Sequence, residues 1–141
     1  MIRGDIILYL AKRSHLESMP EELHYLVPPL LPGSYVFCSY KKQSLPISQC
    51  KGMFQEDEGT TYILLREVAD EYELNYTSEW SCITLQLATE LEMVGFTAKF
   101  SKALADELIP CNVVAGYYHD HIFVPQPLAN KALSVLIGIT I

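Results

Sequence analysis

The second half of the chain shows the clearest pattern of hydrophobic and polar positions. Residues Ser81–Leu87 place Cys, Thr and Gln on one side and Ile and Leu on the other, which is typical of a half-buried strand. A stripe that recurs every four residues then predicts an amphipathic helix ended by Pro110. The stripe consists of Phe96, Phe100, Leu104 and Leu108.

Two more strands and a last helix complete this half. Residues 111–115 and 122–124 are expected to be strands, and an apolar stripe over 128–137 predicts a helix entered after Pro125 and Pro127. The resulting order, β-α-β-β-α, is that of a split βαβ module without its last strand. Residues 139–141 supply a stub at most. The missing strand indicates that the other half of the chain, or another chain, completes the sheet.

The first half has a related but shorter plan. Strand formers fill 34–40, a hairpin is expected over 50–55 and 60–65, and a short acidic helix over 68–73. A helix start is also expected within 19–26. Both halves thus carry a hairpin followed by a helix, a duplication of architecture without duplication of sequence. We divide the chain into an extension (1–18), a first module (19–76) and a second module (77–141).

Composition and charge narrow the possible functions. Half of the 141 residues are hydrophobic and 19% are charged, so a packed core is expected. The net charge of −7 argues against a nucleic-acid-binding face. No run approaches the ~20 apolar residues of a membrane span, and the N-terminus does not have the pattern of a signal peptide. We therefore expect a cytoplasmic protein with no membrane partner.

The four cysteines predict neither a zinc site nor a redox motif. They stand at 38, 50, 82 and 111, and none forms a C-x-x-C pair. Three of them lie in apolar, strand-like surroundings. They are therefore expected to be reduced thiols, mostly buried.

Four stretches resemble a family of small bacterial proteins with tandem ACT domains. The longest is Cys111–Pro125 (CNVVAGYYHDHIFVP). The others are Leu91–Ala98, similar to L-E-A-V-G-L-T-A, Gly33–Cys38, similar to G-E-Y-V-F-C, and Phe54–Thr61, similar to F-R-E-D-E-G-L-T. The resemblance covers about residues 19 to 137. Residues 1–18 have no counterpart in it.

This resemblance implies an α+β fold of two ferredoxin-like ACT modules of the βαββαβ type, with the first incomplete or modified. Their sheets are expected to pair side by side and to bind an amino acid or similar ligand at the pairing interface. It also implies a regulatory protein that is not an enzyme. We expect no cofactor, and the missing edge strand favours a homodimer or intimate pairing of the modules. The eukaryotic arginine sensor and aspartate kinase regulatory domains are more distantly similar.

Asp120 is the first candidate ligand contact. A carboxylate at a turn between strands can hold an ammonium or guanidinium group through charge-assisted hydrogen bonds. The arginine sensor has an aspartate-histidine step similar to Asp120-His121, and its aspartate contacts the ligand. The alternative is that Asp120 bonds to the backbone of its own turn.

His119 and His121 flank this aspartate. An H-x-H pair on a strand shares one face and can bind a metal. Further ligands are not evident near them in the sequence, so we predict no metal site. Contact with an organic ligand, turn hydrogen bonding and packing between modules remain open.

The connection before the predicted helix at 96 is the second candidate. Free backbone N–H groups at a helix N-terminus attract a carboxylate. Here the N–H groups that would receive the carboxylate of a ligand belong to Glu92, Met93, Val94 and Gly95. The Glu92 carboxylate is then available to an α-amine. The alternative is an ordinary strand-to-helix connection whose glycine provides backbone freedom.

Three further residues join the predicted site. Asn112 either reaches a ligand or satisfies a buried backbone group. Gly116 and Tyr117 precede the histidines, and the tyrosine offers either an aromatic wall or an interface contact. Trp80 is expected in the core between the modules.

Two other functions compete with ligand sensing. One is a protein-interaction module that uses exposed sheet edges and binds no small molecule. The other is an acetyltransferase-like or metal-dependent enzyme. It is disfavoured because no P-loop, G-x-S-x-G, H-E-x-x-H or G-x-G-x-x-G motif occurs.

Overall fold

A computed structural model describes residues 30–41, 44–85, 91–92 and 94–137. The predicted extension 1–18, the helix start within 19–26, Met93 and the stub at 139–141 lie outside the described residues. The division of the chain at residue 76 stays a prediction. The remaining predicted elements can be compared with the structure directly.

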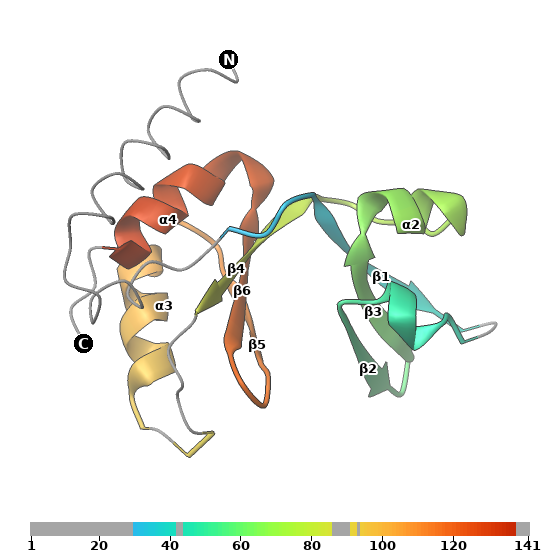
Figure 1. The fold of residues 1–141 in the computed structure, drawn as a ribbon, viewed down its shortest axis with the longest axis horizontal. Helices are drawn as coiled ribbons and strands as arrows, with labels where there is room; N and C mark the ends of the chain where they lie inside the picture. The colour runs from blue at the N-terminus through green and yellow to red at the C-terminus, as the bar shows by residue number, and fades with distance from the viewer. Residues whose placement is uncertain (1–29, 42–43, 86–90, 93, 138–141) are drawn as a thin grey trace.

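Six antiparallel strands form one sheet in the order β2-β3-β1-β4-β6-β5 (Figure 1). The two halves of the sheet have the same strand order when each is followed from its outer edge to the centre, because β2-β3-β1 of the first module corresponds to β5-β6-β4 of the second. The side-by-side pairing of two modules is therefore confirmed, with β1 next to β4. The strands are β1 (Tyr35–Tyr40), β2 (Gly52–Glu56), β3 (Gly59–Leu65), β4 (Trp80–Leu85), β5 (Asn112–Ala115) and β6 (Asp120–Pro125).

The helices show why the first module is the modified one. The second module has α3 (Phe96–Asp106), a short 3₁₀ turn η3 (Gln126–Leu128) and α4 (Ala129–Ile137). The first has α2 (Arg66–Glu71) and, between β1 and β2, only the 3₁₀ turn η2 (Ile47–Gln49). The connection before η2 covers the sheet with a buried side chain, Leu45, whose backbone N–H donates to the Tyr62 hydroxyl at 3.3 Å.

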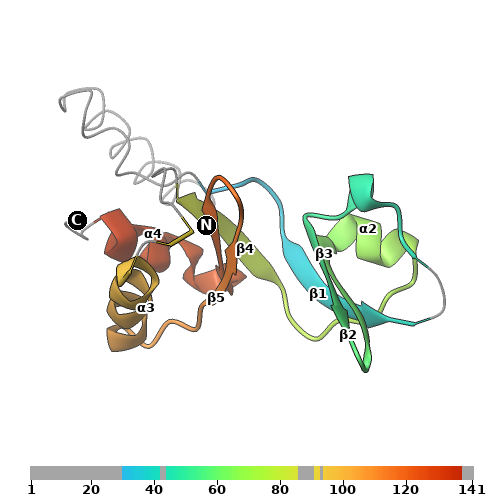
Figure 2. The ribbon, with the colours of Figure 1, turned by 90° about the horizontal axis from the view of Figure 1, so that it is seen from below.

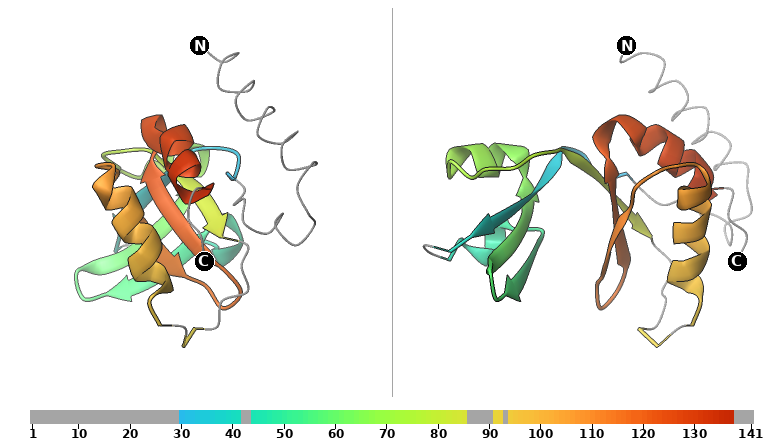
Figure 3. Two further views of the ribbon diagram at one scale, coloured as in Figure 1. Left: turned by 90° about the vertical axis from the view of Figure 1, so that its left-hand side faces the viewer. Right: turned by 180° about the vertical axis from the view of Figure 1, so that it is seen from behind.

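Each module has its own core on the sheet face that its helices cover. The second packs Phe100 and Leu104 of α3 and Leu133 of α4 against β4 and β6. The first packs Ala69 and Leu74 against β1 and β3. We call these the helix faces. Figure 3 shows that α3 and α4 lie on the side of their strands that faces away from the first module.

A third core joins the modules through the opposite sheet faces, which we call the inner faces. Tyr35 and Ile63 of the first module cluster with Cys82 and Phe123 of the second. The Phe37 and Phe123 rings meet edge to face, with centroids 5.3 Å apart. Trp80 packs against this cluster, and its ring centroid lies 5.8 Å from that of Phe37. This agrees with its predicted position between the modules. Below this junction the two hairpins diverge (Figures 1 and 2).

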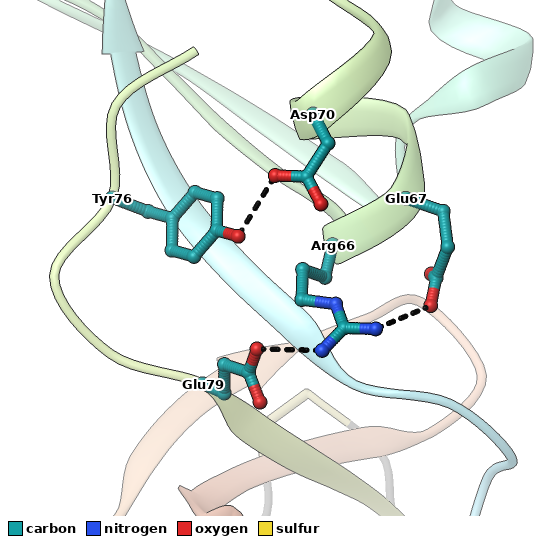
Figure 4. Close-up of polar contacts among 5 residues, drawn as sticks. All are labelled: Arg66, Glu67, Asp70, Tyr76 and Glu79. Carbon is teal, nitrogen blue, oxygen red and sulfur yellow. Dashed lines mark hydrogen bonds and ion pairs between the residues drawn. The ribbon is translucent and has the colours of Figure 1, made fainter. Parts of the chain in front are cut away.

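Polar contacts hold the linker between the modules against α2 (Figure 4). Arg66 Nη1 lies 3.1 Å from Glu79 Oε1, and the Tyr76 hydroxyl donates to Asp70 at 2.8 Å. The Glu79 backbone carbonyl accepts a hydrogen bond from the Gln126 N–H of the second module. Glu79 therefore contacts both modules, with its side chain on one and its backbone on the other.

The predicted stripe of α3 is correct for three residues and wrong for the fourth. Phe96, Phe100 and Leu104 pack on the second core, but Leu108 is 87% exposed. The helix ends before it, and Leu108 adopts a left-handed conformation with φ 57°. Ile109 then turns back into the core, with its N–H bonded to the Leu104 carbonyl at 3.0 Å.

Candidate functional site

Asp120 and the connection that leads to α3 lie at the same end of the second module. Asp120 is the first residue of β6 and pairs with Leu85 of β4. The connection leaves β4 directly after Leu85 and reaches α3 at Phe96. Figures 1 and 3 show that α3 begins at the same end of the module as the β5–β6 turn. Both parts of the predicted site that lie farthest apart in sequence therefore occur at one end of the fold.

Asp120 also belongs to the helix face. Side chains of directly paired residues share a sheet face, and Leu85, its partner, packs in the helix-face core. Ile122, two residues farther along β6, packs there as well. Asp120 thus belongs to the face that α3 covers, at the end where α3 begins, and it is partly buried.

The N-terminus of α3 has no side-chain cap. Gly95 is the N-cap residue, and its φ of 88° is a left-handed conformation that glycine adopts readily. A Cβ at this position would have no atom within 4 Å, so the glycine is needed for conformation and not for space. The first bond of the helix runs from the Lys99 N–H to the Gly95 carbonyl at 3.1 Å. The preceding amides of this turn point out of the helix end, where the dipole favours an anion.

Exposed side chains surround this end of the module. Val94 is 96% exposed, Leu91 is 65% exposed, and Glu92 is also exposed. Tyr117 and Tyr118 in the β5–β6 turn are 78% and 73% exposed, with their rings edge to face at 4.9 Å. The predicted aromatic wall of Tyr117 therefore stands at the surface, outside the core between the modules.

The structure separates the predicted site residues into two sets. His121 follows Asp120 on β6 and therefore belongs to the inner face, where its Nδ1 lies 2.9 Å from the Thr84 hydroxyl. Asn112 is on the inner face too, because it pairs with Phe123. The sequence placed both sets in one site, because it predicted a strand over 122–124 only. β6 begins at Asp120, so Asp120 and His121 belong to opposite faces of the strand.

Gly116 supports the imidazole of His121. A Cβ at Gly116 would lie 3.2 Å from His121 Nε2 and 2.8 Å from the His119 carbonyl oxygen. The Gly116 N–H donates to that carbonyl at 2.9 Å and closes the turn. The glycine is required for close approach here, which is a structural role. His119 Nδ1 is buried and has no hydrogen-bond partner among the residues that the structure describes.

Burial lowers the pKa of His121 below its ordinary value of 6.5, and the positive charge of Lys51 and the neighbouring His119 lower it further. The negative charge of Asp120 acts in the opposite direction. Lys51 belongs to the first module, so the inner faces of both modules act on this imidazole. Sequence analysis missed Thr84 and Lys51. Only the strand alternation could have indicated Thr84, and no local signal indicated Lys51.

Three further predictions from the sequence concern the state of the cysteines, a metal site and a membrane span. All four cysteines are free, and burial raises the pKa of each thiol. In the part of the chain that the structure describes, no three metal-ligating side chains come together. No helix formed by those residues has the length and hydrophobicity to cross a membrane.

Comparison with protein families gives two adjoining matches. Residues 16–81 match a family described as an ACT domain, and residues 75–137 match a second family with the same description. ACT domains are regulatory modules, and neither family describes an enzyme. No curated protein matches the chain.

Solved structures agree with this result. A Vibrio cholerae protein of unknown function, described as a possible transport protein, is 42% identical; the match covers 82% of this chain and 91% of that one, with a TM-score of 0.73. A protein from Agrobacterium tumefaciens is 19% identical over 76% of this chain and 83% of its own, with a TM-score of 0.63.

A more distant structure has a named function. The ligand-free regulatory subunit of aspartate kinase from Thermus thermophilus is 10% identical over 77% of this chain and 92% of its own, with a TM-score of 0.57. At this identity the similarity establishes the shared fold only.

Proposed function

Because this chain belongs to the ACT-domain family and carries two ACT modules in tandem, we propose that it is a regulatory protein that binds an amino acid. The proposed site is the end of the second module formed by Glu92, Val94, Gly95 and Asp120. The observation that carries the proposal is the position of Asp120 on the same sheet face, and at the same end, as the uncapped N-terminus of α3.

The two groups have complementary chemistry for the two ends of an amino acid. The backbone N–H groups of the first turn of α3 would receive the α-carboxylate, where the helix dipole also favours negative charge. Asp120 would receive the α-ammonium or a cationic side chain through charge-assisted hydrogen bonds. Exposed Glu92 adds a second negative charge, which favours a cationic amino acid.

Ligand binding would act through the packing of the modules. The ligand would bridge α3 and the start of β6, and β6 carries Phe123 into the core between the modules. A ligand with different affinities for two module arrangements shifts the population between them. We include in the proposal that the protein works in the cytoplasm.

Thermal denaturation in the presence of each of the twenty amino acids tests this function. A specific ligand at a hundredfold excess over its Kd adds about 2.7 kcal/mol to the free energy of unfolding. We expect one amino acid, or a small group of similar ones, to raise the Tm by several degrees. If no amino acid shifts the Tm, the proposal is wrong, and a protein-interaction module becomes the better explanation.

Calorimetric titration of variants tests the site. Losing one charge-assisted contact in Asp120→Asn should raise the Kd about tenfold to a hundredfold. The matched control is Glu71→Gln, which removes an exposed carboxylate at the end of α2 in the other module. A Kd that Asp120→Asn leaves unchanged would place the ligand elsewhere.

A further inference from the structure

The register of the second module arranges six inner-face residues in two rows that cross its three strands. Directly paired residues of neighbouring strands share a sheet face, which places the members of each row side by side. The first row consists of Asn112, Phe123 and Cys82, and the second row, nearer the β5–β6 turn, consists of Val114, His121 and Thr84. Asn112 and Val114 are exposed, so both rows are open to solvent at β5.

Lys51 of the first module lies beside these rows. Its backbone N–H donates to the Ile63 carbonyl at 2.7 Å, and the Ile63 side chain packs with Cys82 and Phe123 in the core between the modules. The positive charge of Lys51 acts on the Cys82 thiol as well as on the His121 imidazole. Among the described residues, no carboxylate forms an ion pair with Lys51, which is exposed.

Two histidines complete what we call the basic cluster: Lys51, His119 and His121. The Thr84 hydroxyl lies 2.9 Å from His121 Nδ1 and fixes the orientation of that ring. His119 Nδ1 is buried and has no hydrogen-bond partner in the described part of the chain. Buried polar atoms nearly always have a partner in folded proteins. The basic cluster therefore has hydrogen-bonding capacity that the described residues leave unused.

The charges around the basic cluster do not balance. Burial, then Lys51 and then His119 lower the pKa of His121, and Asp120 acts least and in the opposite direction. Asp120 belongs to the helix face of β6, away from Lys51. The inner face thus gathers basic groups from both modules in a chain whose net charge is −7. An anion between these groups would relieve their repulsion.

We propose that the inner faces of the two modules bind a small anion, with a carboxylate or a phosphate-like group, between Lys51 and the two histidines. Lys51 would hold the anion from the first module, and His119 and His121 would hold it from the second. The exposed amide of Asn112, in the neighbouring row, offers a further donor. Such an anion would tie the modules together at a place distinct from the amino-acid site, which lies on the helix face.

NMR titration of the full chain with sulfate tests the proposal through the imidazole resonances. Sulfate represents a phosphate-like group and keeps its charge where histidines titrate. We expect saturable shifts of the His119 and His121 signals, and a higher pKa of His121 in sulfate, because a nearby anion favours the protonated ring. Sodium chloride at equal ionic strength should not reproduce these changes. A parallel titration with acetate represents a carboxylate, and saturation by one probe only assigns the anion class.

Two lysine variants separate the proposed site from general electrostatics. Lys51→Gln should raise the Kd of the binding probe at least about tenfold, because it removes the contact from the first module. Lys102→Gln removes the same charge from an exposed position of α3 and should leave the Kd unchanged. Thermal unfolding of both variants confirms that the fold is retained. If neither sulfate nor acetate gives saturable shifts, or if Lys51→Gln binds as wild type or only as weakly as Lys102→Gln, the proposal is overturned. The amino-acid site shares no residue with the basic cluster, so its own test is unaffected by this result.

Discussion

Because side chains alternate along β6, the adjacent residues Asp120 and His121 lie on opposite faces of the sheet. Asp120 belongs to the helix face near the start of α3, and His121 belongs to the inner face beside Thr84. A sequence motif that contains both residues therefore describes two environments. The residue types could be selected from the sequence as carriers of chemistry. The start of β6 at Asp120 separates them, and the register of β6 against β4 decides which face each one takes.

The lowered pKa of His121 predicts a pH dependence of stability. The folded pKa lies below the ordinary value of 6.5, so the unfolded chain binds the proton more readily. Its contribution to the free energy of unfolding is present above 6.5 and is lost as the pH falls toward the folded pKa. Asp120 moderates this loss, while Lys51 and His119 increase it.

Urea denaturation at about pH 7.5 and at about pH 5 measures this loss. Wild type should lose more stability between the two pH values than His121→Gln, which keeps hydrogen-bonding capacity but does not titrate. Equal losses in the two proteins would contradict a lowered pKa at His121.

At the scale of elements, local sequence signals identified most strands and helices. The hairpin turn before Gly59, the two apolar helical stripes and Pro110 all act within a few residues, so their effects are visible without the fold. The end of α3 was not visible. Leu108 continues the helical spacing, but the chain turns left-handed there and buries Ile109 in its place. Packing of the next residue outweighed the periodic pattern.

The connection between β1 and β2 supports a prediction about core packing. Leu45 is 4% exposed and covers the first-module core where the second module uses α3. Leu45→Ala should reduce the free energy of unfolding by about 2 to 4 kcal/mol through lost burial and the cavity left behind. Ile47→Ala, two residues away on the surface, should change it by less than about 0.5 kcal/mol. Chemical denaturation at low protein concentration compares the two, and similar costs would mean that Leu45 does not cover the core.

At the scale of the whole molecule, one six-stranded sheet and a shared apolar cluster join the modules. Strands β1 and β4 are neighbours through Tyr35 and Trp80, and Phe37 meets Phe123 across the junction. Neither module forms a complete four-stranded ACT sheet from its own described strands. The inner strand of each module, β1 or β4, pairs with the inner strand of the other module. We therefore expect the modules to depend on one another for stability.

This dependence predicts a single unfolding transition. Trp80 is the one tryptophan and lies at the junction, so its fluorescence reports the contact between modules, while far-UV circular dichroism reports the helices and strands of both. The two signals should give the same denaturation midpoint. A fluorescence transition at lower denaturant than the dichroism transition would show that the modules separate before they unfold.

The sequence by itself determined the strands, the amphipathic helices, the two-module plan and the family. These depend on periodicity, on turn residues and on motifs, all of which lie within short stretches of chain. The tertiary structure alone decided that Asp120 lies on the sheet face that α3 covers, at the end where α3 begins, that His121 faces the first module and that β2 is left as an apolar edge. These features depend on strand order and register, which are set by long-range pairing and by the burial of inner faces between modules. No short segment contains that information.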